Sequence, residues 1–185
     1  MDRTDLLLDQ YRQQLALPFR FDLSGAERVW IAVYPPEIER RLRFRLPEFD
    51  LATKEAGRRW SQVDLTRSFA EWLGAQEYRE AYFEDPEAMK PALRDFAQSV
   101  ATRVRDALTA DDVDADTIVG IYGVASLFPM TRVSDLVHAV APDVRGRLLV
   151  FFPGAFEQGN YRLLDARDGW NYLAVPITIP EGATR

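Results

Sequence analysis

Two unbroken apolar runs in the second half of the chain predict the central strands of the fold. Residues 117–123 read Thr-Ile-Val-Gly-Ile-Tyr-Gly, and residues 147–152 read Arg-Leu-Leu-Val-Phe-Phe. Such runs are typical of parallel strands whose two faces are both covered by helices. Between them, apolar residues recur at helical spacing from 133 to 140, and Pro142 ends that pattern. The segment therefore predicts a strand, a helix and a second parallel strand.

The beginning of the chain predicts a helix and a buried strand. Residues 4–17 carry leucines and a tyrosine at helical spacing, with Thr4 or Asp2 available as the N-terminal cap. A loop is expected over residues 19–25. Residues 28–34 read Arg-Val-Trp-Ile-Ala-Val-Tyr, which predicts a strand that is buried on both faces.

The middle of the chain continues the alternation. A short helix is expected over residues 38–46, where apolar residues follow at four-residue steps. Residues 60–65 alternate in polarity and predict a less buried strand. A helix with an aromatic cluster is expected over 69–83, and the sequence Asp-Pro at residues 85–86 breaks it. Residues 93–108 follow the helical period most closely of all.

The last part of the chain predicts a polar connection and one more strand. The connection is expected over residues 154–169, and the strand over 172–179. Pro176 favours an edge position for this strand, because proline cannot donate a ladder hydrogen bond. Residues 180–185 are expected to be frayed.

Alternating strands and helices predict the fold class, which is α/β. We expect a three-layer αβα sandwich with a mostly parallel sheet. Residues 1–185 are expected to form a single domain, in which residues 1–25 provide an N-terminal helix and loop.

Composition narrows the class of protein. The chain is 47% hydrophobic and 28% charged, as in a soluble globular domain, and its net charge of −6 argues against a surface built for nucleic acid. The absence of cysteine excludes disulfides, thiolate metal sites and cysteine nucleophiles. Acidic residues interrupt the first apolar positions, and no apolar run reaches the roughly 20 residues that cross a bilayer. We therefore expect a cytoplasmic protein without membrane contact.

The motifs of common enzymes are not completed. After the first strand the chain has Pro-Pro at 35–36, which removes the amide donors that a phosphate-binding loop needs. Gly120 and Gly123 do not complete a dinucleotide fingerprint. Ser126 lacks the paired glycines of a nucleophile elbow, and the single histidine, His138, is expected at the surface. We therefore predict no catalytic residues, no metal site and no cofactor.

Candidates for binding remain at the carboxyl ends of the strands, where parallel sheets collect ligands. Arg132 opens a helix there, where it could bind a phosphate or an acidic partner, or form a salt bridge within its own loop. The ligand or partner candidates are Arg132, Asp64, Ser126, Glu157 and Asn160.

A second set of residues could form an interface. One helix carries four arginines, which could bind phosphate, dock an acidic partner or simply face solvent. Three aromatic residues near the end of the chain either pack their loop onto the domain or, if exposed, mark an interface. The interface candidates are Arg40, Arg41, Arg43, Arg45, Tyr161, Trp170 and Tyr172.

Three ordered motifs lie between residues 117 and 177, at residues 123–132, 150–156 and 162–172. They resemble motifs of the BrxB family of BREX bacteriophage-exclusion systems. Residues 123–132, Gly-Val-Ala-Ser-Leu-Phe-Pro-Met-Thr-Arg, are similar to its Gly-Val-Gly-x-x-Phe-Pro-x-x-Arg segment. Residues 150–156, Val-Phe-Phe-Pro-Gly-Ala-Phe, resemble its Phe-Phe-Pro-Gly-Glu-Tyr segment. Residues 162–164 followed by 168–172 resemble its closing Arg-Leu-Phe and Asp-x-x-Tyr-Tyr elements.

The chain departs from these motifs at three positions. Ala125 replaces the second glycine, Ala155 replaces the glutamate and Phe156 replaces the tyrosine. A catalytic task for that glutamate would be lost here unless Glu157 took it over. The resemblance also implies a fold like that of nucleotide-binding proteins but without the phosphate loop.

The resemblance implies a non-enzymatic accessory subunit of an antiphage complex. Its implied partners are other BREX proteins, namely a PglZ-type protein of the alkaline-phosphatase superfamily, a methyltransferase and a large ATPase. We therefore expect an adaptor that docks on a larger defence protein and meets DNA only through the complex. Two alternatives remain, a degenerate nucleotide- or phosphate-binding enzyme and a protein that binds nucleic acid through its arginine-rich helix.

Overall fold

A parallel sheet forms the centre of the molecule. The structure is a computed structural model, and it describes residues 2–164, 173–180 and 182. Five strands run parallel in the order β2-β3-β4-β1-β6, and β5 pairs antiparallel with the end of β4. The strands are β1 Val29–Tyr34, β2 Arg59–Asp64, β3 Thr117–Tyr122, β4 Arg147–Glu157, β5 Asn160–Leu163 and β6 Val175–Thr178.

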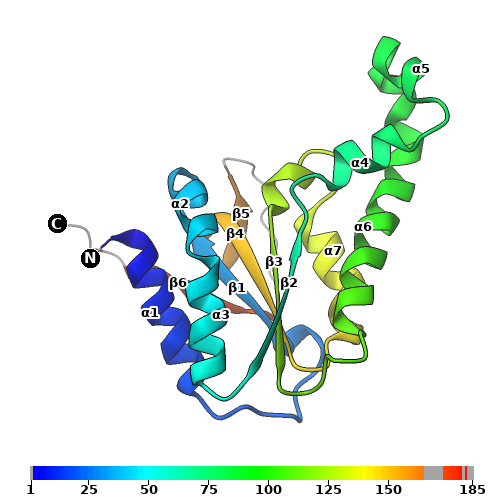
Figure 1. Cartoon of the computed structure of the whole chain (residues 1–185). Coiled ribbons are helices and arrows are strands. Elements are labelled where there is room, and N and C mark those ends of the chain that lie inside the picture. The colour runs from blue at the N-terminus through cyan, green and yellow to red at the C-terminus, as the bar shows by residue number, and fades with distance from the viewer. Residues whose placement is uncertain (1, 165–172, 181, 183–185) are drawn as a thin grey trace.

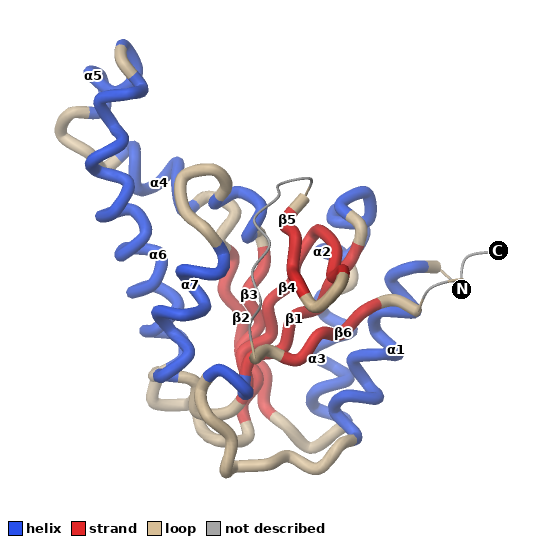
Figure 2. Tube along the Cα trace, turned by 180° about the vertical axis from the view of Figure 1, so that it is seen from behind, coloured by secondary structure: helices blue, strands red, loops and turns tan. Residues whose placement is uncertain are grey.

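Helices cover both faces of the sheet. The α-helices are α1 Arg3–Ala16, α2 Glu39–Phe44, α3 Leu46–Glu55, α4 Ser68–Gly74, α5 Arg79–Glu84, α6 Leu93–Leu108 and α7 Val133–Val140. Short 3-10 helices are Ala26–Arg28, Pro36–Ile38, Pro86–Ala92, Val124–Leu127 and Ala141–Asp143. Figure 1 shows α1 and α3 on one side of the sheet and α6 and α7 on the other. The view from behind shows the same three layers (Figure 2).

The two apolar faces of each central strand explain this layering. Every residue of β1 is buried. Val29, Ile31 and Val33 belong to the core under α6 and α7, whereas Trp30 and Ala32 belong to the core under α1 and α3. Because successive side chains of a strand point to opposite faces, one continuous apolar run supplies both cores. The predicted α/β class and the three layers are confirmed.

Two predictions about individual strands are also confirmed. β2 is less buried than β1, as its alternating pattern predicts, and it lies at one edge of the sheet. β6 lies at the other edge, where Pro176 stands opposite Ile31 of β1. The missing amide of the proline is tolerated there because no strand follows on its outer side. Among the described residues, no helix combines the length and the apolar character needed to cross a membrane.

The prediction of one helix over residues 38–46 is wrong in its bounds, because two helices begin in this range. The chain forms a 3-10 turn and then α2, breaks at Arg45 and enters α3 at Leu46. Arg45 takes φ −102° and ψ 5°, outside the helical range, and Pro47 then begins a new helix. The sequence missed α3 because Ala52 and Thr53 contribute to its buried side and weaken the apolar stripe.

The predicted polar connection over 154–169 is wrong in its first half. β4 continues to Glu157, and β5 returns beside it as a hairpin. Gln158 and Gly159 take φ 51° and 79° at the turn, which is the geometry that two-residue hairpins favour. Tyr161 and Leu163 alternate with less buried neighbours, and this period of two was the available signal. Residues 165–172 lie outside the described residues.

Candidate functional site

Polar side chains form a continuous chain across the carboxyl edge of the sheet. The hydroxyl of Tyr34, at the end of β1, donates to Glu39 in α2. Glu39 also accepts from Nε of Arg43 at 2.7 Å. The guanidinium of Arg43 lies 5.8 Å from the ring centre of Tyr122, at the end of β3. Tyr122 stands opposite Asp64 of β2 in the sheet register.

The ionisation of this chain follows from its burial. Burial and the neighbouring Glu39 raise the pKa of Tyr34 well above its usual value. Burial and Asp64 likewise raise the pKa of Tyr122. Burial works to raise the pKa of Asp64, but hydrogen bonds from Thr66 outweigh it and the pKa is lowered. At neutral pH both tyrosines are therefore protonated: Tyr34 donates to Glu39, and Tyr122 lies between Arg43 and Asp64.

Asp64 has a structural task in the loop after β2. Its carboxylate accepts from the backbone amide of Thr66 at 2.9 Å and from the Thr66 hydroxyl. Gly123 presses against the same loop with φ +78°, and a Cβ there would lie 2.4 Å from the Thr66 hydroxyl oxygen. Thus the first glycine of the 123–132 motif is required by a close approach of two loops.

Ser126 is not brought together with a base among the described residues. Ser126 lies half-buried in the 3-10 turn after β3, and no described hydrogen bond joins its hydroxyl to a histidine or carboxylate. His138 is exposed on α7, as predicted, and Arg132 is exposed at the start of that helix. Within the described ranges, no group of three histidine, aspartate or glutamate side chains could hold a metal ion.

Three further candidates from the sequence, Glu157, Asn160 and Tyr161, lie in the hairpin of β4 and β5. Glu157 forms a salt bridge of 3.1 Å with Arg162 across the hairpin, and Asn160 lies at its turn. Tyr161 is only 1% exposed, packs against Phe156 at 4.6 Å between ring centres and donates its hydroxyl to a backbone carbonyl. Burial raises its pKa. Tyr161 therefore packs the hairpin onto the domain and offers no surface; Trp170 and Tyr172 lie outside the described residues.

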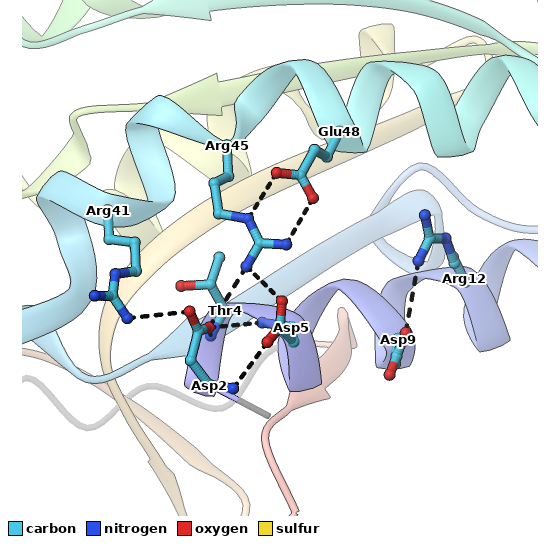
Figure 3. Close-up of polar contacts among 8 residues, drawn as sticks. All are labelled: Asp2, Thr4, Asp5, Asp9, Arg12, Arg41, Arg45 and Glu48. Carbon is cyan, nitrogen blue, oxygen red and sulfur yellow. Dashed lines mark hydrogen bonds and ion pairs between the residues drawn. The ribbon is translucent and has the colours of Figure 1, made fainter.

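Three of the four clustered arginines already have carboxylate partners. Arg41 pairs with Asp2 at 3.0 Å, and Arg43 pairs with Glu39. Arg45 bonds Asp5 and Glu48, each at 2.6 Å, as Figure 3 shows. Arg40 is exposed and has no salt bridge to a described residue.

This arginine network joins the N-terminal helix to the body. Asp2 caps α1 by accepting from the amides of Thr4 and Asp5 at 2.7 and 3.0 Å. These contacts lower the pKa of Asp2, and the amide of Asp2 and the guanidinium of Arg45 lower that of Asp5. Arg41 and Arg45 therefore hold the start of α1 against α2 and α3 (Figure 3).

Sequence reasoning missed the most exposed feature of the molecule. The segment of residues 74–92, which we call the arm, contains α5 and a 3-10 helix. Both views show α5 beyond the far end of α6, away from the sheet (Figures 1 and 2). Tyr78 and Phe83 are 65% and 63% exposed, and no side chain from residue 69 to 95 is buried. The aromatic cluster was visible in the sequence, but its exposure was not.

The protein is a three-layer α/β domain, and polar side chains at the carboxyl edge of its sheet contact one another. A scan against protein families places the chain more narrowly: the model described as BREX protein BrxB matches residues 62–177. This match covers more than half of the chain, so the protein belongs to the BrxB family and is a component of a BREX system. Searches of the curated proteins and of the solved structures found no match.

Proposed function

We propose that this protein is a non-enzymatic adaptor of its BREX system and docks through the arm on a larger defence protein, such as a PglZ-type protein. The exposure of the arm carries the proposal. Membership of the BrxB family supports an accessory role in antiphage defence. The described polar groups at the carboxyl edge are paired with one another, which also favours an adaptor over an enzyme.

The arm has the composition of an interaction element. Large aromatic side chains in the centre of an interface commonly provide most of the binding energy. Tyr78 and Phe83 expose such rings to water, and exposed apolar rings lower the solubility of a protein. A bound partner would cover these rings, and removing their apolar surface from water would favour binding.

The charge of the arm indicates what the partner surface looks like. Within residues 74–92, five carboxylates stand against two basic side chains, Arg79 and Lys90. Complementary charges speed encounter and exclude wrong partners. The expected partner surface is thus an apolar groove with lysine or arginine at its rim.

Co-purification tests this proposal. The tagged protein would be expressed with the PglZ-type protein of its own system, as wild type and as the double variant Tyr78→Ala/Phe83→Ala. Phe44→Ala is the matched control, because Phe44 is 77% exposed but lies on α2. We expect the arm variant to lose at least about tenfold in affinity, since hot-spot residues contribute 2 kcal/mol or more.

Two results would contradict the proposal. An arm variant that binds as well as the Phe44→Ala control would remove the arm from the interface. Failure of the wild type to bind any BREX protein of its system would remove the adaptor role itself.

A further inference from the structure

The amino edge of the sheet, opposite the arm, contains an arginine that forms no salt bridge with a described carboxylate. Arg147 is the first residue of β4 and is only 3% exposed. Its two terminal nitrogens donate to the backbone carbonyls of Gly146 and Arg20, at 2.9 and 2.8 Å. Its Nε is buried and has no hydrogen-bond partner. No described carboxylate forms a salt bridge with it, which is rare for a buried charge.

Neighbouring groups increase the positive charge at this place. Arg28 also donates to backbone carbonyls only, and its Nε is another buried nitrogen without a partner. Burial, followed by repulsion from Arg28 and Arg58, lowers the pKa of Arg147 to about 10. Repulsion of this kind is relieved when an anion binds nearby.

Aromatic rings hold the guanidinium in place. Its carbon lies 4.0 Å from the ring centre of Phe19 and 5.8 Å from that of Trp30. Such contacts stabilise a cation but do not neutralise it. Arg147 and Arg28 also fix the loop of residues 17–25, because they bond the carbonyls of Arg20 and Phe21. The arginine is therefore rigid and remains charged.

Arg147 is one of the residues that line a cavity at this edge. Its volume is about 320 Å³, which suits a small ligand. Its walls are mostly apolar: Leu17, Pro18, Phe19, Leu23, Trp30 and Val175. Its polar lining consists of Arg147, Arg20, Gln14 and Glu27. The Glu27 carboxylate accepts two hydrogen bonds from Ser24 and forms no salt bridge with Arg147. Arg20 pairs with Asp22.

We propose that this cavity binds a small organic acid, with the carboxylate against Arg147 and an aromatic or aliphatic group among the apolar walls. The uncompensated charge requires an anion, and the apolar walls require a hydrophobic body attached to it. The proposal concerns a different surface from the arm and does not depend on the adaptor role.

Phenylacetate is a suitable probe, with phenylacetamide as its neutral analogue and acetate as the analogue without a ring. Each would be titrated into the full-length protein while the indole N–H signals are followed by NMR. We expect phenylacetate to move the signal of Trp30 in a saturable way and to leave that of Trp72, on α4, unchanged. Phenylacetamide and acetate are expected to bind at least about tenfold more weakly, since each lacks one of the two interactions.

Two variants are expected to change the affinity for phenylacetate in opposite directions. Arg147→Met removes the charge but keeps an apolar chain of similar length, and we expect it to lose at least tenfold in phenylacetate affinity. Glu27→Gln removes the described carboxylate that lines the cavity, and we expect binding to strengthen roughly threefold.

The wild-type titrations decide the proposal even if Arg147→Met does not fold. Equal effects of phenylacetate and phenylacetamide on Trp30 would overturn it, because charge would then play no part. The absence of any change at Trp30 with phenylacetate would overturn it as well. Weaker binding in Glu27→Gln than in the wild type would contradict the placement of the carboxylate.

Discussion

The arm and the body of this protein use the same kinds of residue in opposite ways. In the body, the ring of Phe151 is fully buried, 5.1 Å from the ring of Phe49. In the arm, Tyr78 and Phe83 remain mostly exposed. Aromatic burial stabilises the body by itself, whereas the aromatics of the arm need another surface for their burial. The body is therefore stabilised by its own aromatic contacts, whereas the proposed role of the arm is contact with a partner.

The largest expected effect concerns the body. Phe151→Ala would leave a cavity between α3 and the sheet, and we expect a loss of about 3–5 kcal/mol in the free energy of unfolding. Phe83→Ala removes the same atoms from the arm and serves as its control. Urea unfolding followed by circular dichroism measures both. Similar losses for the two variants would contradict the claim that aromatic residues stabilise the body and not the arm.

The next effect concerns the loops at the carboxyl edge of the body. Gly123→Ala would place a methyl group 2.4 Å from the hydroxyl oxygen of Thr66, at φ +78°. We expect a loss of about 2–3 kcal/mol from strain and displacement. Gly57→Ala is the matched control, because Gly57 has φ +73° but nothing within 4 Å of an added Cβ. Equal losses in thermal unfolding would mean that the close approach to Thr66 costs nothing.

A smaller effect is expected where α1 joins the body. Asp2→Ala removes the cap of α1 and a partner of Arg41, which costs about 1 kcal/mol at pH 7. The pKa of Asp2 is lowered in the folded state, so its stabilisation is complete above the usual pKa of about 4 and disappears as the pH falls through the lowered value. Unfolding at pH 7 and pH 3 measures this difference. Asp9→Ala, on the same helix, is the control and should change stability little at either pH.

The smallest effect on stability is expected in the arm. Tyr78→Ala/Phe83→Ala should change the free energy of unfolding by no more than about 0.5 kcal/mol per residue, because exposed side chains contribute little to folding. Thermal unfolding measures this directly. A loss near that of Phe151→Ala would show that the arm folds as part of the core and is not reserved for a partner.

The sequence predicted the body better than the arm for a physical reason. A buried strand or an amphipathic helix leaves a regular apolar pattern, so the strands β1 and β3 and the helix α6 could be placed from their residues alone. The hairpin of β4 and β5 was missed because its pattern is short and its turn, Gln158-Gly159, is not the most common pair. α3 was missed because small residues carry part of its buried side.

The sites could be predicted less well, because exposure and pairing depend on tertiary contacts. Asp64 lies at the carboxyl end of β2, as predicted, but the approach of Arg43 from α2 was not predicted. Asp2 and Asp5, which pair with Arg41 and Arg45, lie about forty residues earlier in the chain, and no local pattern indicates such pairs. Arg147 likewise bonds backbone carbonyls and no described carboxylate, and no sequence pattern indicates this.

Hydrogen exchange of the complex with the PglZ-type protein tests the central claim most directly. The account predicts that amides of the arm, residues 74–92, exchange more slowly in the complex than in the free protein. The amides of the loops near Asp64 and of α2 should keep their rates. Protection of those loops or of α2, with an arm that exchanges as fast as in the free protein, would contradict the account.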